Sequence, residues 1–463
     1  MAAANTWALL LASLVLVPIA IGACIKMPRI ATYGFIALFF MFASSTWGQI
    51  NTEATLYARG TGLFYFSLVN LLLFIAGAAA LIRKLANPYV PYFVFPWPHY
   101  FGAFLFLLIA HLLMGMMMGV EIPLILGYNG IINIVNMLLF MYIILMALHD
   151  EKDKRNLMLL IIFLAAIRGA YGLVRYVLFG GDTANPYRNF EGIDVSIFFF
   201  DIGDNFVCAL GGFAAAWLLT SPQVRMSLTK RIMLYAFLAL MIAAVALSFR
   251  RSSLLGLILM FALLLYRLPA KQKILFGSLA LAALFATISV MVRARLQDAG
   301  ASGGLLSSLF YDIMGDRSGE QGRFYELYAA ANSLGSNWLF GLGSWGTFTG
   351  DREALSYHLG RMDFIHSGFG HIVLKSGVAG LLAFCALLYS YITYYFRHRK
   401  HLQGNSALLA DTGFAGMLFW IPTLLIGTPI IEFRTMMLLG LTLAMPFVAV
   451  GLHRRMHTNY VIA

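Results

Sequence analysis

Four basic side chains have the types and spacing to handle a phosphorylated substrate. Arg250 and Arg251 are adjacent in "SFRRSSLLGL", Arg323 follows Gly322 in "GRFYELYAAANSL", and His366 opens "HSGFGHIVLKSGVAG". A guanidinium group holds phosphate or carboxylate through a planar fork of N–H donors, and an imidazole accepts a proton near neutral pH. One interpretation is therefore an anion clamp with a general base. The alternatives are an interfacial anchor at the arginine pair, a solvated loop residue at Arg323 and a structural histidine at His366.

A second group of charged residues lies inside apolar stretches. Arg168 and Arg175 are seven residues apart on one helix face, and Asp201 and Asp204 share a face of the next apolar stretch. Because Arg175 and Asp201 lie at similar depth, we expect an ion pair between them, with the lining of a polar cavity as the alternative. The other supporting candidates are Arg317, His371, Lys375 and Arg434.

Metal and nucleotide chemistry lack a sequence signature in this chain. We find no set of His, Cys and acidic residues with metal-ligand spacing, no P-loop and no Ser/His/Asp arrangement. The expectation is therefore a reaction that uses neither a metal nor another cofactor.

The composition indicates which elements must position these residues. The 463 residues are 61% hydrophobic and 11% charged, with a mean hydropathy of +0.81. Long apolar runs recur along the whole chain, so we predict an all-α polytopic membrane protein, a bundle of about 12 to 14 transmembrane helices. The expected spans lie near residues 7–25, 33–49, 63–82, 100–119, 131–148, 157–179, 197–219, 232–248, 252–267, 274–292, 367–395, 407–426 and 435–452.

The distribution of charge predicts the orientation of these helices. One alternating set of loops holds 18 Lys and Arg against three acidic residues, and the positive-inside rule places that set in the cytoplasm. The large loop at about 293–366 and the Arg250/Arg251 pair then face outward. Eight of the nine lysines fall on the inner side, so the outer cations are all arginine. The basic charge of the chain is thus a topology signal, and no nucleic-acid partner is expected.

The large external loop is expected to contain amphipathic helices. From Arg323 onward, apolar residues follow helical spacing, and Arg323 falls in the first turn, where the helix dipole favours an anion. The predicted apolar face consists of Phe324, Leu327, Tyr328, Ala331 and Leu334.

Three blocks of the chain resemble the O-antigen ligase and polysaccharide polymerase superfamily of bacterial inner-membrane glycosyltransferases. "SFRRSSLLGL" is similar to its Ser-Arg-small-apolar block, "GRFYELYAAANSLGSNWLFGLGSWGTF" to its Arg-aromatic helix and Gly-rich turn, and "HSGFGHIVLKSGVAG" to its His block, with Gly377 and Gly380 in register. The resemblance divides the chain into N-terminal helices at 1–245, a catalytic core at 246–395 and C-terminal helices at 396–463.

The resemblance implies a specific reaction. The family uses an undecaprenyl-pyrophosphate-linked glycan as donor and a sugar hydroxyl as acceptor, without nucleotide or metal. Carried over, His366 is the base that deprotonates the acceptor, and Arg250 or Arg251 acts with Arg323 on the pyrophosphate. Ser367 stands where the family usually has Asn and Lys375 where many members have an acid, which affects acceptor identity.

Several functions remain open at this point. Polymerisation of lipid-linked repeat units is the leading expectation. The acceptor is then a lipid-linked repeat unit, membrane lipids surround the chain, and a chain-length regulator is an optional partner. The alternatives are ligation of a finished glycan to lipid A-core, a lipid-linked oligosaccharide flippase or transporter, and a non-catalytic polyprenyl-lipid binder. The absence of internal repeats and the clustering of unusual residues on one side favour an enzyme over a transporter.

Overall fold

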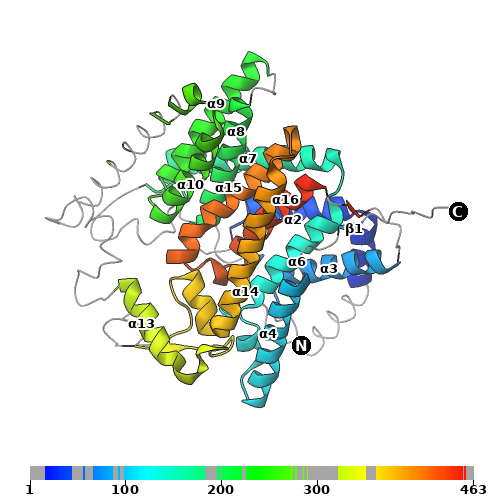
Figure 1. Ribbon diagram of the computed structural model, residues 1–463, viewed down its shortest axis with the longest axis vertical. Coiled ribbons are helices and arrows are strands. Elements are labelled where there is room, and N and C mark those ends of the chain that lie inside the picture. The colour runs from blue at the N-terminus through cyan, green and yellow to red at the C-terminus, as the bar shows by residue number, and fades with distance from the viewer. Residues whose placement is uncertain are drawn as a thin grey trace.

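The computed structural model describes a helical bundle (Figure 1). The described residues are 16–43, 56–57, 66–86, 92–93, 98–182, 196–199, 201–221, 226–274, 277–278, 285, 289, 322–350, 361–451 and 453–454. Among them, eight helices are long and apolar enough to cross a membrane, or nine if the bent pair Leu16–Lys26 and Pro28–Met41 counts as one span. The prediction of an all-α polytopic membrane protein is confirmed. The predicted total of 12 to 14 includes segments outside the described residues.

The elements follow one another with short connections. The helices are α2 (Pro28–Met41), α3 (Leu68–Ala86), α4 (Pro98–Met117), α5 (Ile122–Ile125), α6 (Ile132–Ala147), α7 (Glu151–Phe179), α8 (Ile202–Thr220), α9 (Leu228–Ala246), α10 (Arg251–Arg267), α13 (Gly322–Leu334), η2 (Gly335–Trp338), α14 (Gly368–Arg399), α15 (Gly404–Ile426), η4 (Pro429–Ile431) and α16 (Phe433–Val450). The strands form two antiparallel pairs, β1 (Tyr92–Phe93) with β4 (His453–Arg454) and β2 (Phe348–Thr349) with β3 (Arg361–Met362).

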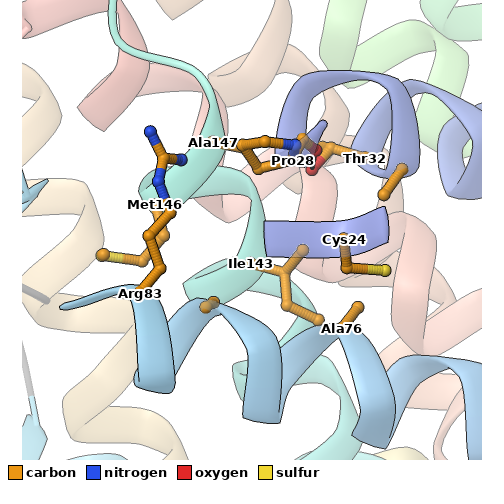
Figure 2. A pocket seen from close by; sticks show the side chains of 10 residues that line it. Cys24, Pro28, Thr32, Ala76, Arg83, Ile143, Met146 and Ala147 are labelled. Carbon is orange, nitrogen blue, oxygen red and sulfur yellow. Dashed lines mark hydrogen bonds between the residues drawn. The ribbon is translucent and has the colours of Figure 1, made fainter. Parts of the chain in front are cut away.

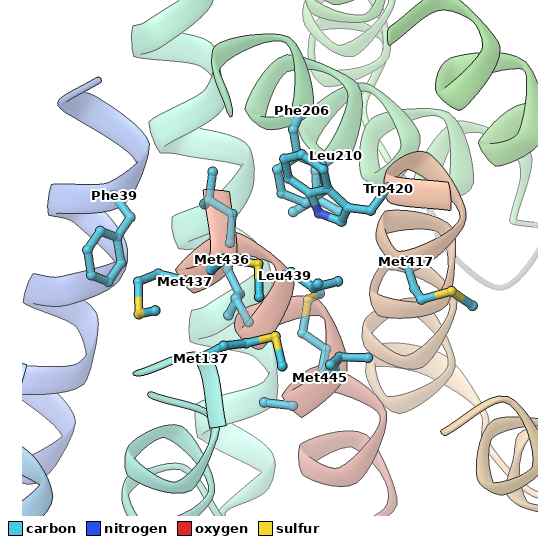
Figure 3. Close-up of a cluster of buried hydrophobic side chains, with 14 of the residues drawn as sticks. Phe39, Met137, Phe206, Leu210, Met417, Trp420, Met436, Met437, Leu439 and Met445 are labelled. Carbon is cyan, nitrogen blue, oxygen red and sulfur yellow. The ribbon is translucent and has the colours of Figure 1, made fainter. Parts of the chain in front are cut away.

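Three helices occupy the centre of the bundle. In their most apolar 18-residue windows, α16 is 94% buried, α8 83% and α15 78%, whereas α9 is only 17% buried and presents most of its apolar surface outward. Figure 3 shows the side chains that fill the centre, among them Met436 and Met437 of α16. Phe206 of α8 stacks on Trp420 of α15 with ring centroids 4.6 Å apart. Unbranched methionines adapt to the gaps left between such rings.

Helix ends alternate between the two sides of the bundle because short loops join consecutive helices. The starts of α8, α10, α14 and α16 therefore share one side, which we call the His366 end. The contact between Arg434 at the start of α16 and Asp204 at the start of α8 agrees with this arrangement.

One helix is broken where the external loop meets it. Gly377 of α14 has φ 64° and ψ −168°, so residues 368–376 and 378–399 form two helical segments. The turn after η2 fills the break: Leu342 N donates to Leu374 O at 2.8 Å, and Ala379 N donates to Leu339 O at 3.1 Å. Only glycine fits at Gly377, because a Cβ there would lie 2.2 Å from Leu339 O.

A small cavity lies at the opposite end of the bundle (Figure 2). Its volume is about 20 Å³, and its lining comes from α2, α3 and α6 together with Cys24. This is room for about one water molecule, so it is no substrate site.

Candidate active site

His366 lies directly before α14, on the turn that leads from β3 into the helix. The Ser367 side chain caps this helix by accepting a hydrogen bond from Gly370 N at 3.2 Å. The His366 side chain is 36% exposed, and the Phe364 ring stands edge-on to it at 5.2 Å. The imidazole is thus held in place and still reachable, as a general base must be.

Glu326 of α13 contacts His366 at two places, a pairing that we did not predict. His366 Nδ1 lies 2.8 and 3.0 Å from the two Glu326 carboxylate oxygens, and His366 N donates to Oε2 at 2.9 Å. Forty residues separate the pair in sequence. The available signal was weak: Glu326 is the only acidic residue of α13.

The α13 helix forms as predicted, but its buried face is rotated from the expected one. Tyr328 and Ala331 are exposed, whereas Ala329, Ala330 and Leu334 are buried. The prediction of the face was wrong because α13 does not pack through Tyr328 and Ala331. Its alanines pack against a second core formed with Phe348, Met362, Ile365 and Leu374.

Arg250 and Arg251 mark the start of α10. Phe249 has φ 53°, a left-handed conformation that costs a non-glycine residue about 1–2 kcal/mol. Ser248 Oγ then accepts from Arg250 N at 3.3 Å, so Arg250 is the N-cap and Arg251 the first helical residue. Both side chains are half-buried. Two guanidinium groups at the positive end of a helix dipole are suited to an anion.

Arg250 is electrostatically linked to Glu432, the N-cap of α16. The field of Arg250 lowers the pKa of Glu432, whereas burial and the charge of Asp201 raise it more, to about 7. The carboxylate also accepts a hydrogen bond from Thr435 Oγ1 at 2.6 Å. This places Glu432 between the Arg250 charge and the buried ion network described next.

Four of the predicted supporting residues form a buried ion network. Arg168 donates to both oxygens of Asp204, at 3.0 and 2.7 Å. Arg434 donates to Asp204 at 2.7 Å and lies 3.4 Å from Asp201. The two cations and two anions balance, which is what a low-dielectric interior requires. Their arrangement ties α7, α8 and α16 together.

The expected ion pair between Arg175 and Asp201 is corrected by this arrangement. Arg175 lies 3.7 Å from Asp182 and donates to Phe198 O at 2.8 Å, whereas Asp201 lies beside Arg434. Equal depth did not determine the pairing, because Asp201 is the N-cap of α8 and its carboxylate also accepts from Gly203 N.

The two deeper candidates on α14 lie away from the site. Lys375 donates to the carbonyls of Ser344 and Gly346 at 3.1 and 2.7 Å, and thus holds the turn that fills the helix break. His371 is 1% exposed, and neither of its ring nitrogens has a hydrogen-bond partner among the described residues. We assign Lys375 a structural role.

Two predicted residues are only partly or not at all described. Arg323 lies in the first turn of α13, as expected, but its side chain is outside the described residues, and Arg317 lies outside them altogether. Within the described part of the chain, no group of three or more His, Cys, Asp or Glu is placed to hold a metal ion.

The candidate residues lie on elements that contact one another. The α10 helix packs on α15, α15 contacts η4, and both η4 and α13 contact α14. Asn133 Nδ2 donates to Ile430 O at 2.9 Å, and Asn129 Nδ2 donates to Asp363 at 2.5 Å, so α6 joins the same end. The structure thus gathers a half-exposed imidazole and an arginine pair at the His366 end.

Residues 236–385 match the family model described as O-Antigen ligase. The matched segment contains Arg250, Arg251, Glu326 and His366. The predicted resemblance to the O-antigen ligase and polymerase superfamily is confirmed, and it supports glycan transfer of this general type by a multi-pass membrane protein. No curated protein matches the chain.

Proposed function

We propose that the chain transfers a glycan from an undecaprenyl-pyrophosphate donor to a sugar hydroxyl, and that it polymerises lipid-linked repeat units of a surface polysaccharide. The observation that carries the proposal is the His366 end, where an accessible imidazole and two consecutive arginines lie on connected elements of the segment that matches the family. In this proposal residues 246–395 are the catalytic core between the helices of 1–245 and 396–463.

The chemistry requires a base and a cation clamp. The acceptor oxygen forms a bond to the anomeric carbon while the bond from that carbon to the phosphate oxygen breaks. His366 takes the hydroxyl proton, and the pyrophosphate leaves with the electron pair. Arg250, Arg251 and Arg323 stabilise the charge that grows on this leaving group. The donor bond itself supplies the driving force, so no nucleotide or metal enters the scheme.

The charge pattern supports an outward-facing site in a bacterial inner membrane. Arg83 and Lys84 in the last turn of α3, and Arg397 and Arg399 in that of α14, lie at the end opposite to His366. The positive-inside rule makes that end cytoplasmic. Accessibility of single cysteines introduced at exposed positions of each end, probed with a membrane-impermeant thiol reagent, tests this orientation.

Product analysis tests the function itself. The purified protein in lipid nanodiscs receives an undecaprenyl-pyrophosphate oligosaccharide, with and without lipid A-core and with no nucleotide or metal. A ladder of products supports the polymerase, and one shifted band of lipid A-core would assign a ligase instead. No product in either case, together with translocation of the donor in vesicles, would overturn the enzyme and favour a flippase.

Variants connect this activity to the proposed residues. His366→Ala should abolish product formation, and unimpaired turnover of this variant would leave only a lipid binder or another base. Arg250→Ala and Arg251→Ala should weaken turnover while folding is retained. Arg397→Ala, which removes an exposed arginine at the opposite end, is the matched control.

A further inference from the structure

The contact between Glu326 and His366 has the geometry of a carboxylate that orients a histidine. Both carboxylate oxygens lie within 3.0 Å of Nδ1, and Oε2 also accepts the His366 backbone N–H at 2.9 Å. The ring and the backbone of one residue are therefore held by the same side chain. The Glu326 side chain is only 13% exposed, so little water competes for these hydrogen bonds.

This contact determines which ring nitrogen carries the proton. An ionised carboxylate has only acceptor sites, so a nitrogen hydrogen-bonded to it must donate. Nδ1 then bears the hydrogen of the neutral ring, and Nε2 holds the lone pair. When Nε2 takes up a proton, the positive charge of the imidazolium arises beside a fixed negative charge.

We propose that Glu326 is a positioning residue for the reaction, one that holds His366 in the tautomer whose Nε2 accepts the acceptor proton. The inference rests on the proposed function of His366 as base. Glu326 does not itself gain a proton: the acceptor proton moves to Nε2, Nδ1 keeps its own, and the carboxylate stays ionised. Because Glu326 belongs to α13 and His366 to the turn before α14, this contact also fixes the external helix above the site.

A helix-docking role alone would give the same contact, and three substitutions separate the two. Glu326→Gln keeps the size and one acceptor oxygen but removes the charge and adds an N–H donor, which can hold the other tautomer. Glu326→Asp keeps the charge on a shorter stem, and Glu326→Ala removes both. Asn332→Ala, at an exposed position of the same helix, is the matched control.

Kinetics in nanodiscs give the first readout. Glu326→Gln should lower kcat about 10- to 100-fold, as the loss of a histidine's orienting partner does elsewhere, with the donor KM unchanged. Glu326→Asp should recover part of the loss, and Asn332→Ala should match the wild type. Equal kcat in Glu326→Gln and wild type, or a loss that appears only in KM, would overturn the positioning role.

A spectroscopic readout is independent of activity. With ¹⁵N-ring-labelled histidine, the His366 signals are identified by their absence in His366→Gln, and their shifts report the tautomer. The wild type should show Nδ1–H, and Glu326→Gln should show a mixture or the Nε2–H form. An Nε2–H wild type, or unchanged signals in Glu326→Gln, would refute the inference. If instead the spectra behave as expected while no condition yields product, the proposed function fails and the pairing stands.

Discussion

Replacing Glu432 with glutamine should remove a specific pH dependence from the stability of the protein. Burial and the nearby Asp201 raise the pKa of Glu432 from its ordinary 4.5 to about 7, against the opposing fields of Arg250 and Arg434. Between these two pH values the folded protein keeps a proton on Glu432 that the unfolded chain has released. The stabilisation from this group is therefore complete below about pH 4.5 and is lost as the pH rises through 7.

The size of the effect follows from the same two values. The difference between 4.5 and about 7 corresponds to at most about 3 kcal/mol of unfolding free energy. Unfolding in mixed detergent micelles measures this free energy from pH 4.5 to pH 8. The difference between wild type and Glu432→Gln should change by up to this amount across the range, because contributions from other titrating groups cancel in the difference.

Two further variants make the reasoning testable. Glu121→Gln, at an exposed position of the loop before α5, should keep the wild-type pH dependence. Arg250→Ala removes a field that lowers the Glu432 pKa, so it should move the loss of stability to higher pH. A pH dependence that is the same in Glu432→Gln and wild type would refute the account, and an unmoved midpoint in Arg250→Ala would refute the link between the two residues.

Three other substitutions test structural features of the same end of the bundle. Arg434→Met leaves Asp201 without its partner and Asp204 with only Arg168, so it should cost about 3–5 kcal/mol of unfolding free energy in the same micelle assay. Gly377→Ala drives a Cβ to 2.2 Å from Leu339 O at a positive φ, so it should abolish activity and raise protease sensitivity, whereas Gly102→Ala, with open space around it, should be tolerated. Lys375→Met should destabilise the protein by about 1–3 kcal/mol through the unpaired carbonyls of Ser344 and Gly346, and any kcat change beyond the folded fraction would contradict its structural role.

The helices and their grouping at two ends could be predicted because hydropathy and loop charge act locally along the chain. Apolar runs gave the positions of α7, α8, α15 and α16 to within a few residues. The starts of α10 and α14, which carry Arg250 and His366, were expected on one side from the alternation of loops, and the structure gathers connected elements there.

The pairing of side chains could not be predicted because it depends on how distant segments meet. Glu326 reaches His366 across 40 residues, and Arg434 reaches Asp204 across 230. The face of α13 failed for a related reason. Its small residues Ala329 and Ala330 turn inward to pack on β2 and β3, so the partner decides the buried face and not the larger apolar side chains alone.

The break in α14 separates the motion of the proposed base from that of the membrane helix behind it. A continuous helix would act as a rigid rod: the 22 residues of 378–399 span about 33 Å, so a tilt of about 5° would move the far end by about 3 Å. The break at Gly377 interrupts that rod. The short segment 368–376 is pinned instead by Ser367 at one end and by the turn at Leu342 and Gly343 at the other. His366 therefore moves with the external helix α13, and bilayer-driven tilting of the long segment is absorbed at the hinge.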